Sequence, residues 1–293
     1  MTQRSIQEKG LGIFLGILSA IFVAGYITTN KYIYGHYDIS ALEYSVVFAL
    51  AGAFYAIFSL ARQLDKTNRL LISKNAAPLL TVGVAGVLAV GIFTIGQQYT
   101  TSVNASLLMT STIVATALFS HKFLNESHRG TQYAWMAVLF VGLYIGVVGF
   151  QSIQLRSGDL IVLSSALFFG FGNSYSRVVM KRMGGAKLVP NVRLTIGGII
   201  ALALSPFLLK QLSVPIDFIP YALLAGLFYW LCMKTFAKAV YLINANNTIV
   251  LNNAQIFFTS LGGVLILGEN YSIEKLIGSL IAITAIYFIA IKK

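Results

Sequence analysis

The chain has 293 residues, of which 57% are hydrophobic and only 10% are charged, and its mean hydropathy is +0.79. A soluble domain carries about a quarter charged residues, so this composition excludes an ordinary water-soluble protein and predicts an integral membrane protein. The net charge of +12 does not indicate nucleic-acid binding. The basic residues lie in short gaps between apolar runs, not in one tail or stripe.

Ten apolar runs follow one another along the chain, each near the length of about 20 residues that a helix needs to cross a bilayer core. The first is too long for a signal-peptide core and has no obvious cleavage site, so we expect it to be retained. Because a backbone in lipid must satisfy its own hydrogen bonds, the sequence predicts an all-α membrane protein of ten transmembrane helices. The predicted spans are 11–33, 40–61, 75–98, 102–121, 131–150, 158–180, 189–209, 218–240, 245–268 and 273–291.

Lysine and arginine are concentrated in alternate gaps between these runs. Cytoplasmic loops carry the excess of basic residues, so this bias predicts that both termini are cytoplasmic. We expect a multi-pass protein of the bacterial inner (cell) membrane. The basic side holds Arg4, Lys9, Arg62, Lys66, Arg69, Lys74, Lys122, Arg129, Lys181, Arg182, Lys187, Lys234, Lys238, Lys292 and Lys293. The other side holds Lys31, Arg156, Lys210 and Lys275.

The two halves of the chain, 1–150 and 151–293, resemble each other. Residues 12–31 read GIFLGILSAIFVAGYITTNK and residues 158–177 read GDLIVLSSALFFGFGNSYSR, which share an initial Gly, a Ser-Ala pair, a Phe and a final basic residue. Each half holds five predicted spans, and an odd number turns the second half upside down in the membrane. This predicts the inverted repeat of many secondary transporters, whose halves exchange conformations around a central site. The alternative is duplication without alternation, as in a channel or scaffold.

Other matching positions carry a family resemblance. A Gly-Asp-Leu at 158–160 opens the sixth span, and apolar-Glu steps at 123–126 (FLNE) and 266–269 (ILGE) precede spans five and ten. With ten spans in two repeats, the chain resembles the drug/metabolite transporter superfamily, specifically its EamA-like permeases. The resemblance implies transport of a small metabolite through a central cavity without ATP, with amino acids and amines as typical cargo. The chain departs from the family pattern at 110–113 and 253–256, where a proline is usual and none is present.

Two charged residues inside spans are candidate substrate ligands, because a charge in the bilayer needs a compensating role. Glu43 is a candidate counter-ion for a cationic substrate or a proton-coupling carboxylate. Its alternatives are an interfacial pair with Lys31 or stabilisation of its own helix N-terminus. Lys234 is a candidate contact for a carboxylate or phosphate, against the alternative that it reaches the cytoplasmic interface.

Lys31, Arg177 and Arg193 are candidate gating residues. By the repeat, Arg193 roughly mirrors Glu43, and Arg177 mirrors Lys31. Each half therefore places two ionisable groups near one face, where they could pair in one state and part in another. The alternative is ordinary anchoring at the cytoplasmic interface.

The remaining binding candidates are polar or aromatic residues within the spans. Asn252 on the ninth span is expected to line the cavity, and Gln97 ends the third span. Such groups either join helices or line a wet cavity. Aromatic residues beside the ionisable groups would suit an organic cation or an aromatic amino acid. These are Tyr26, Tyr44, Tyr229 and Trp230.

No residue pattern indicates an enzyme. The three histidines fall at span ends or loops, and neither an HExxH, a CxxC nor a Walker A pattern is present. We therefore expect no metal, no cofactor and no nucleic-acid partner. The predicted function is a secondary transporter, acting by alternating access in the lipid bilayer as an exporter, with proton coupling open and a monomer sufficient. The cargo is an amino acid, amine or related metabolite. The alternatives are a carrier of phosphorylated or nucleotide-linked metabolites, or a non-transporting membrane protein.

Overall fold

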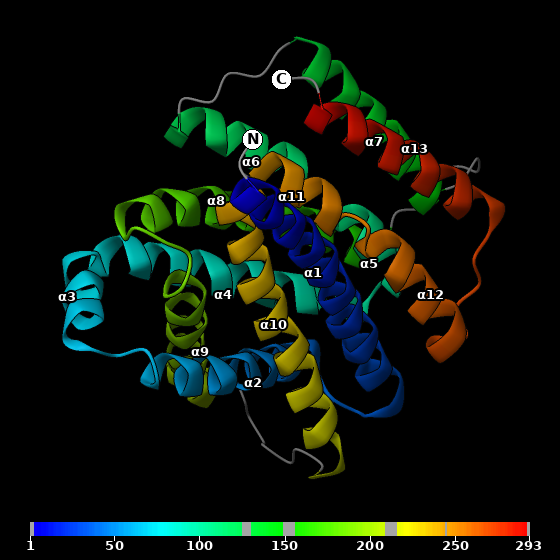
Figure 1. Ribbon diagram of the computed structural model, residues 1–293. Coiled ribbons are helices and arrows are strands. Elements are labelled where there is room, and N and C mark those ends of the chain that lie inside the picture. The colour runs from blue at the N-terminus through cyan, green and yellow to red at the C-terminus, as the bar shows by residue number, and fades with distance from the viewer. Residues whose placement is uncertain (1–2, 125–129, 149–155, 209–215, 244, 292–293) are drawn as a thin grey trace.

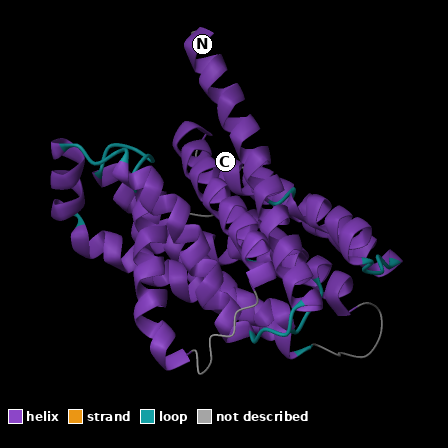
Figure 2. Cartoon of the chain, turned by 90° about the horizontal axis from the view of Figure 1, so that it is seen from below, coloured by secondary structure: helices purple, strands orange, loops and turns teal. Residues whose placement is uncertain are grey.

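The computed structural model describes residues 3–124, 130–148, 156–208, 216–243 and 245–291, which form helices and short connections without any strand (Figure 2). The all-helical class predicted from the composition is confirmed. The first half contains α1 Gln3–His36, α2 Ala41–Ala61, α3 Lys66–Lys74, α4 Ala76–Gln98, α5 Ser102–Met109, α6 Thr112–Leu124 and α7 Gly130–Val148. The second contains α8 Ser157–Arg182, α9 Val189–Leu208, the 3-10 turn η1 Ile216–Phe218, α10 Ile219–Ile243, α11 Ala245–Asn252, α12 Gln255–Leu267 and α13 Ile273–Ile291.

Seven stretches of the described chain are long and apolar enough to cross a membrane. They are Gln7–His36, Ala41–Ala61, Ala76–Gln98, Ser102–Phe123, Gly130–Val147, Val189–Phe207 and Ile219–Ile243. The expectation of ten spans in an inverted repeat is therefore not confirmed and stays a prediction. The other predicted spans coincide with α8, with α11 and α12 together, and with α13. Helix α8 is continuous but less apolar than these seven, because its sequence includes the polar residues Asp159, Asn173 and Arg177.

Side chains at the helix ends explain where several helices begin and end. Ser40 caps α2, since its hydroxyl accepts from the backbone N–H of Glu43 at 3.2 Å. Asp65 caps α3 by accepting from Asn68 N–H at 2.7 Å. This short helix lies between the predicted spans 40–61 and 75–98, where no helix was predicted. Helix α12 ends at Gly268, whose φ of 65° is a left-handed conformation that glycine adopts without strain.

The predicted spans 102–121 and 245–268 are each built from two helices instead of one. At the first break, Thr110 and Ser111 donate both a backbone N–H and a hydroxyl to carbonyls three residues back. At the second, the Asn253 amide donates at 2.6 Å to the carbonyl that its own backbone N–H also uses. Side-chain groups therefore compete with backbone N–H groups for the same carbonyls. We infer that this competition interrupts the helices at both breaks, neither of which contains a proline.

Helices of the first half pair with helices of the second half (Figure 1). Extensive packing joins α1 to α10, α4 to α8, α2 to α9, and α7 to α13. In Figure 1, α7 and α13 lie side by side along one edge of the molecule, and the other pairs surround its centre. Helices α5 and α11 both have 8 residues, α6 and α12 both have 13, and α7 and α13 both have 19.

Glycines permit the closest of these approaches. A methyl group on Gly142 of α7 would stand 2.8 Å from the backbone nitrogen of Ala282 on α13. A side chain on Gly278 of α13 would clash with the backbone of Gly146. The Gly142-x-x-x-Gly146 spacing thus lets the two backbones touch, as small residues do between membrane helices.

Candidate functional site

A central cavity of about 520 Å³ of empty space, part of it open to solvent, lies among α1, α5, α6, α8, α10, α11 and α12. It is lined by Val23, Tyr26, Met109, Thr112, Ile113, Phe169, Asn173, Cys232, Met233, Phe236, Ile249, Asn252, Asn253 and Gln255.

Both helix breaks open onto this central cavity. Met109 and Thr112 flank the first break, and Asn252, Asn253 and Gln255 form the second. Helices α6 and α12 therefore begin at the cavity wall, where the N-terminal end of a helix carries a partial positive charge. Interrupted helices that meet at a central cavity form the substrate sites of many secondary transporters.

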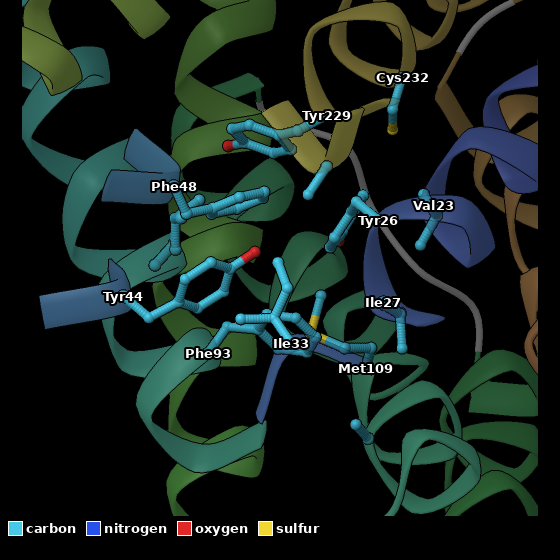
Figure 3. Packing of buried hydrophobic residues seen from close by; sticks show 14 of the residues in the cluster. Val23, Tyr26, Ile27, Ile33, Tyr44, Phe48, Phe93, Met109, Tyr229 and Cys232 are labelled. Carbon is cyan, nitrogen blue, oxygen red and sulfur yellow. The ribbon is translucent and has the colours of Figure 1, made fainter. Parts of the chain in front are cut away.

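One side of the central cavity rests on a buried aromatic cluster. The Tyr26 ring lies 5.8 Å from Phe48, 6.0 Å from Phe93 and 5.5 Å from Tyr229, measured between ring centroids. Figure 3 shows these rings converging beside Cys232, which is buried on the same helix as Tyr229. Of these four rings, that of Tyr26 lines the central cavity, and the other three pack behind it.

A second cavity, which we call the arginine cavity, adjoins the central cavity and contains about 380 Å³ of empty space. The two cavities share Asn173, Met233 and Phe236. The remaining lining residues of the arginine cavity are Ser176, Arg177, Met180, Val189, Pro190, Arg193, Ala237 and Val240.

Arg193 lies one turn into α9 and is only 4% exposed. Its Nη1 donates to Asn173 Oδ1 at 3.2 Å, which ties the guanidinium to the boundary between the two cavities. Arg193 also lines a third, smaller cavity, which we call the tyrosine cavity because Tyr229 forms part of it. The tyrosine cavity is otherwise lined by Ala49, Gly86, Val87, Val90, Leu194 and Gly197.

The model of the EamA-like transporter family matches residues 10–148 and 156–291. The chain belongs to this family. It is also 24% identical over 217 residues to an uncharacterized transporter of Methanothermobacter thermautotrophicus, a match that covers 72% of the chain and 63% of that protein. It is 24% identical over 213 residues to the uncharacterized transporter YyaM of Bacillus subtilis, covering 70% of the chain and 68% of that protein.

One solved crystal structure of a protein has the same fold as this EamA-like transporter, with a TM-score of 0.64 over 96% of both chains at 16% identity. The family and the apolar helices together indicate a multi-pass membrane protein of the EamA-like transporter family. The described residues contain no group of three or more His, Cys, Asp or Glu side chains that could hold a metal.

Five predicted site residues of the EamA-like transporter lie at the cavities. Tyr26 and Asn252 line the central cavity, where the Asn252 amide donates to Ser19 at 2.8 Å. Arg177 and Arg193 line the arginine cavity. Tyr229 joins them through the tyrosine cavity.

Three other predicted residues lie together at a different place, the end of the molecule that holds Lys31. The Tyr44 hydroxyl donates to Asn30 at 2.6 Å, and the Asn30 amide donates to Gln97 Oε1 at 3.1 Å. The Lys31 ammonium donates to the carbonyls of Gln97 and Gln98, both at 3.3 Å, at the C-terminal end of α4. Gln97, Tyr44 and Lys31 thus join α1, α2 and α4. Lys31 does not line the arginine cavity with Arg177 and Arg193.

Glu43, Trp230 and Lys234 have local partners and do not line the central cavity. The Glu43 carboxylate accepts from the Ser40 backbone N–H at 3.1 Å and hydroxyl at 2.7 Å, which completes the cap of α2. The Lys234 ammonium lies 4.3 Å above the Trp230 ring, and the Trp230 indole donates to Asn191 Oδ1 at 3.0 Å. The Glu43 contacts are those of a helix cap, which was one of its predicted alternatives, whereas the ring contact of Lys234 was not predicted. The binding roles of both residues stay predictions.

Asn173 was not among the predicted site residues, although it lies at the junction of the two larger cavities. The signal was present in the sequence: Asn173 precedes Arg177 by four residues, so the two share a face of α8. Gln255 and Thr112 also line the central cavity and lie where the family pattern usually has proline.

Proposed function

We propose that this EamA-like protein is a secondary transporter that carries a small organic metabolite across a bilayer by alternating access. The observation that carries the proposal is the meeting of both helix breaks at one central cavity. A break inside a span frees backbone groups and helix ends for a ligand, and it also provides a hinge. The proposed substrate lies against Tyr26 of the aromatic cluster, with amide and hydroxyl groups opposite.

We further propose that the chain consists of two inverted five-helix units, residues 1–150 and 151–293. The equal lengths of matching helices, their pairing across the halves and the two family matches support this division. Two units related by an axis in the membrane plane can exchange conformations, which moves the opening of the cavity from one face to the other. One chain then forms a complete pathway, with both termini in the cytoplasm and transport in the export direction.

The residues around the cavities favour an amino acid or related metabolite over a simple amine. None of the residues lining the three described cavities is acidic, whereas Arg193 and Arg177 are basic. A simple amine would lack a counter-charge there. A phosphorylated metabolite remains the second candidate, because the same two arginines suit a phosphate group.

Counterflow in proteoliposomes tests the proposed transport. Vesicles containing the purified protein and a mixture of unlabelled amino acids should accumulate a labelled amino acid, and vesicles loaded with buffer should not. Thr112→Trp, which fills the central cavity, should abolish the accumulation. Leu118→Trp is the matched control on α6, since Leu118 is 53% exposed, and it should leave transport unchanged. Equal accumulation in loaded, unloaded and protein-free vesicles, for amino acids and phosphorylated metabolites alike, would contradict the proposal.

A further inference from the structure

Arg193 places a positive charge inside a span, and the described part of the chain offers it no acidic partner. It is 4% exposed, and its α-carbon lies about 6 Å inside α9 at the usual rise per residue. The residues that line the two cavities it borders include no Asp or Glu, and Arg177 lines one of them as well. A buried charge is costly unless it is paired. The charge balance around Arg193 therefore calls for an anion from outside the protein.

The guanidinium also has free donors on one edge. Its Nη1 is used by Asn173, whereas Nε and Nη2 are buried and have no hydrogen-bond partner in the described part of the chain. In a guanidinium, the N–H groups of Nε and Nη2 point in parallel from the same edge. This edge matches the two oxygens of a carboxylate, which accept two parallel hydrogen bonds.

Glycines flank this edge on two helices. A methyl group on Gly86 of α4 would stand 2.7 Å from Nε, and a methyl group on Gly172 of α8 would stand 3.3 Å from Nη2. The first distance is close to that of an acceptor oxygen hydrogen-bonded to a nitrogen. The bare backbone at Gly86 therefore leaves room beside the donors that a side chain would take, and Gly86 itself lines the tyrosine cavity.

We propose that the Nε–Nη2 edge of Arg193 binds the carboxylate of the transported molecule, so that the substrate class is small carboxylates, amino acids among them. This proposal rests on the proposed transport function and deepens it. Asn173 holds the guanidinium in place, and the organic part of the substrate extends past Asn173 into the central cavity, toward Tyr26 and Phe169. Ligand binding supplies the missing counter-charge.

Ligand pairs that differ only in the anion test the proposal. The melting temperature of the purified protein is measured with each L-amino acid and with 3-phenylpropionate, and each value is compared with that for the corresponding carboxamide. Inorganic phosphate and phenyl phosphate are measured in the same way as alternative anions. In wild type, at least one carboxylate should raise the melting temperature, and its amide should bind at least ten-fold more weakly. Arg193→Gln should bind the acid and the amide equally. Arg193→Lys, which keeps the charge but loses the edge, should bind the acid at least ten-fold more weakly than wild type.

A structural role for Arg193 predicts a different result for the protein without ligand. If the arginine holds the fold together, Arg193→Gln lowers the melting temperature of the empty protein. If it serves an absent anion, Arg193→Gln removes an unpaired buried charge and leaves that temperature unchanged or higher. Gly86→Ala gives a second route, because its methyl group obstructs the acceptor position. Gly91→Ala is its matched control on α4, since no atom lies within 4 Å of the added methyl. The first variant should lose carboxylate binding and the second should keep it.

The outcomes separate the carboxylate site from transport itself. Counterflow that persists in Arg193→Gln with unchanged affinity overturns the carboxylate site and leaves the transport function standing. Equal binding of acid and amide by wild type, or no binding of any carboxylate, also overturns it. Tighter binding of phosphate or phenyl phosphate than of every carboxylate overturns the substrate class. If wild type shows no counterflow with any substrate, both the proposed transport function and the carboxylate site are overturned.

Discussion

Single buried side chains join three helices at the Lys31 end of the molecule. Gln97, Asn30 and Tyr44 are each fully buried, and their amide and hydroxyl groups satisfy one another in a chain that ends at the carbonyl of Ile27. Because no water reaches these atoms, their donors and acceptors depend on these partners alone. We infer that the network fixes the relative positions of α1, α2 and α4.

Replacement of Gln97 by leucine should therefore destabilise the protein. The Asn30 amide and the Ile27 carbonyl would lose their partner, which costs about 1–3 kcal/mol for buried polar groups. We expect a lower apparent melting temperature in detergent. Tyr99→Leu is the adjacent control, because the Tyr99 side chain is 52% exposed, and it should have little effect. If both variants melt like wild type, the network does not hold the helices.

For single residues, the sequence could indicate contacts within one helix but not contacts between helices. Glu43 follows Ser40 by three residues, which is the spacing of a helix-capping box, and this local signal accounts for the contacts of its carboxylate. Lys234 lies one turn after Trp230 on the same helix, so its ring partner was also local. Arg193 and Asn173 are on different helices, α9 and α8, and the packing of both helices against α4 brings them together.

Among the elements, the predicted spans 40–61, 75–98 and 273–291 agree with α2, α4 and α13 within a residue. Long apolar runs determine such helices, because lipid permits few other structures. The breaks within 102–121 and 245–268 were not predicted. No proline marks them, and the competing side-chain hydrogen bonds at Thr110, Ser111 and Asn253 become visible only in three dimensions.

Helix α5 begins with a cap from the other half of the chain. The Glu269 carboxylate accepts from the backbone N–H groups of Ser102 at 2.7 Å and Val103 at 3.3 Å. A carboxylate at a helix N-terminus is stabilising, and loss of such a cap costs about 0.5–2 kcal/mol. The equivalent residue of the first half, Glu126, lies outside the described residues.

Glu269→Ala should lower the apparent melting temperature, since α5 loses two acceptors at once. Glu269→Gln retains one side-chain oxygen as an acceptor and should lie between alanine and wild type. Both are measured by thermal unfolding in one detergent without ligand. An alanine variant as stable as wild type would show that water replaces the cap.

For the whole molecule, hydrogen bonds join the two halves at both ends. Near the start of α9, the Asn191 amide donates to Ser59 at 3.1 Å and to Gln63 at 3.3 Å. Three further contacts lie at the Lys31 end. Glu269 joins Ser102, Asp159 accepts from the Thr100 hydroxyl, and the Tyr37 hydroxyl donates to the Asp217 carbonyl at 3.2 Å. The arginine cavity lies toward the opposite end, where α8 ends and α9 begins. We infer that the three contacts at the Lys31 end close the central cavity from that face. Alternating access then requires these contacts between the halves to break.

Cys232 provides a direct test of that requirement, because it is the only cysteine of the chain and it lines the central cavity. A small, membrane-impermeant thiol reagent should modify it slowly from the face that bears the termini, and more slowly still from the Lys31 face. Asp159→Asn, which weakens one contact between the halves, should increase modification from the Lys31 face. Cells and inverted vesicles present the two faces separately, and Cys232→Ser supplies the unlabelled control.

A carboxylate that binds at Arg193 should protect Cys232 from both faces, since both routes end in the same cavity. Modification that is equally fast from both faces in wild type would indicate an open channel, and the alternating halves would then have no role.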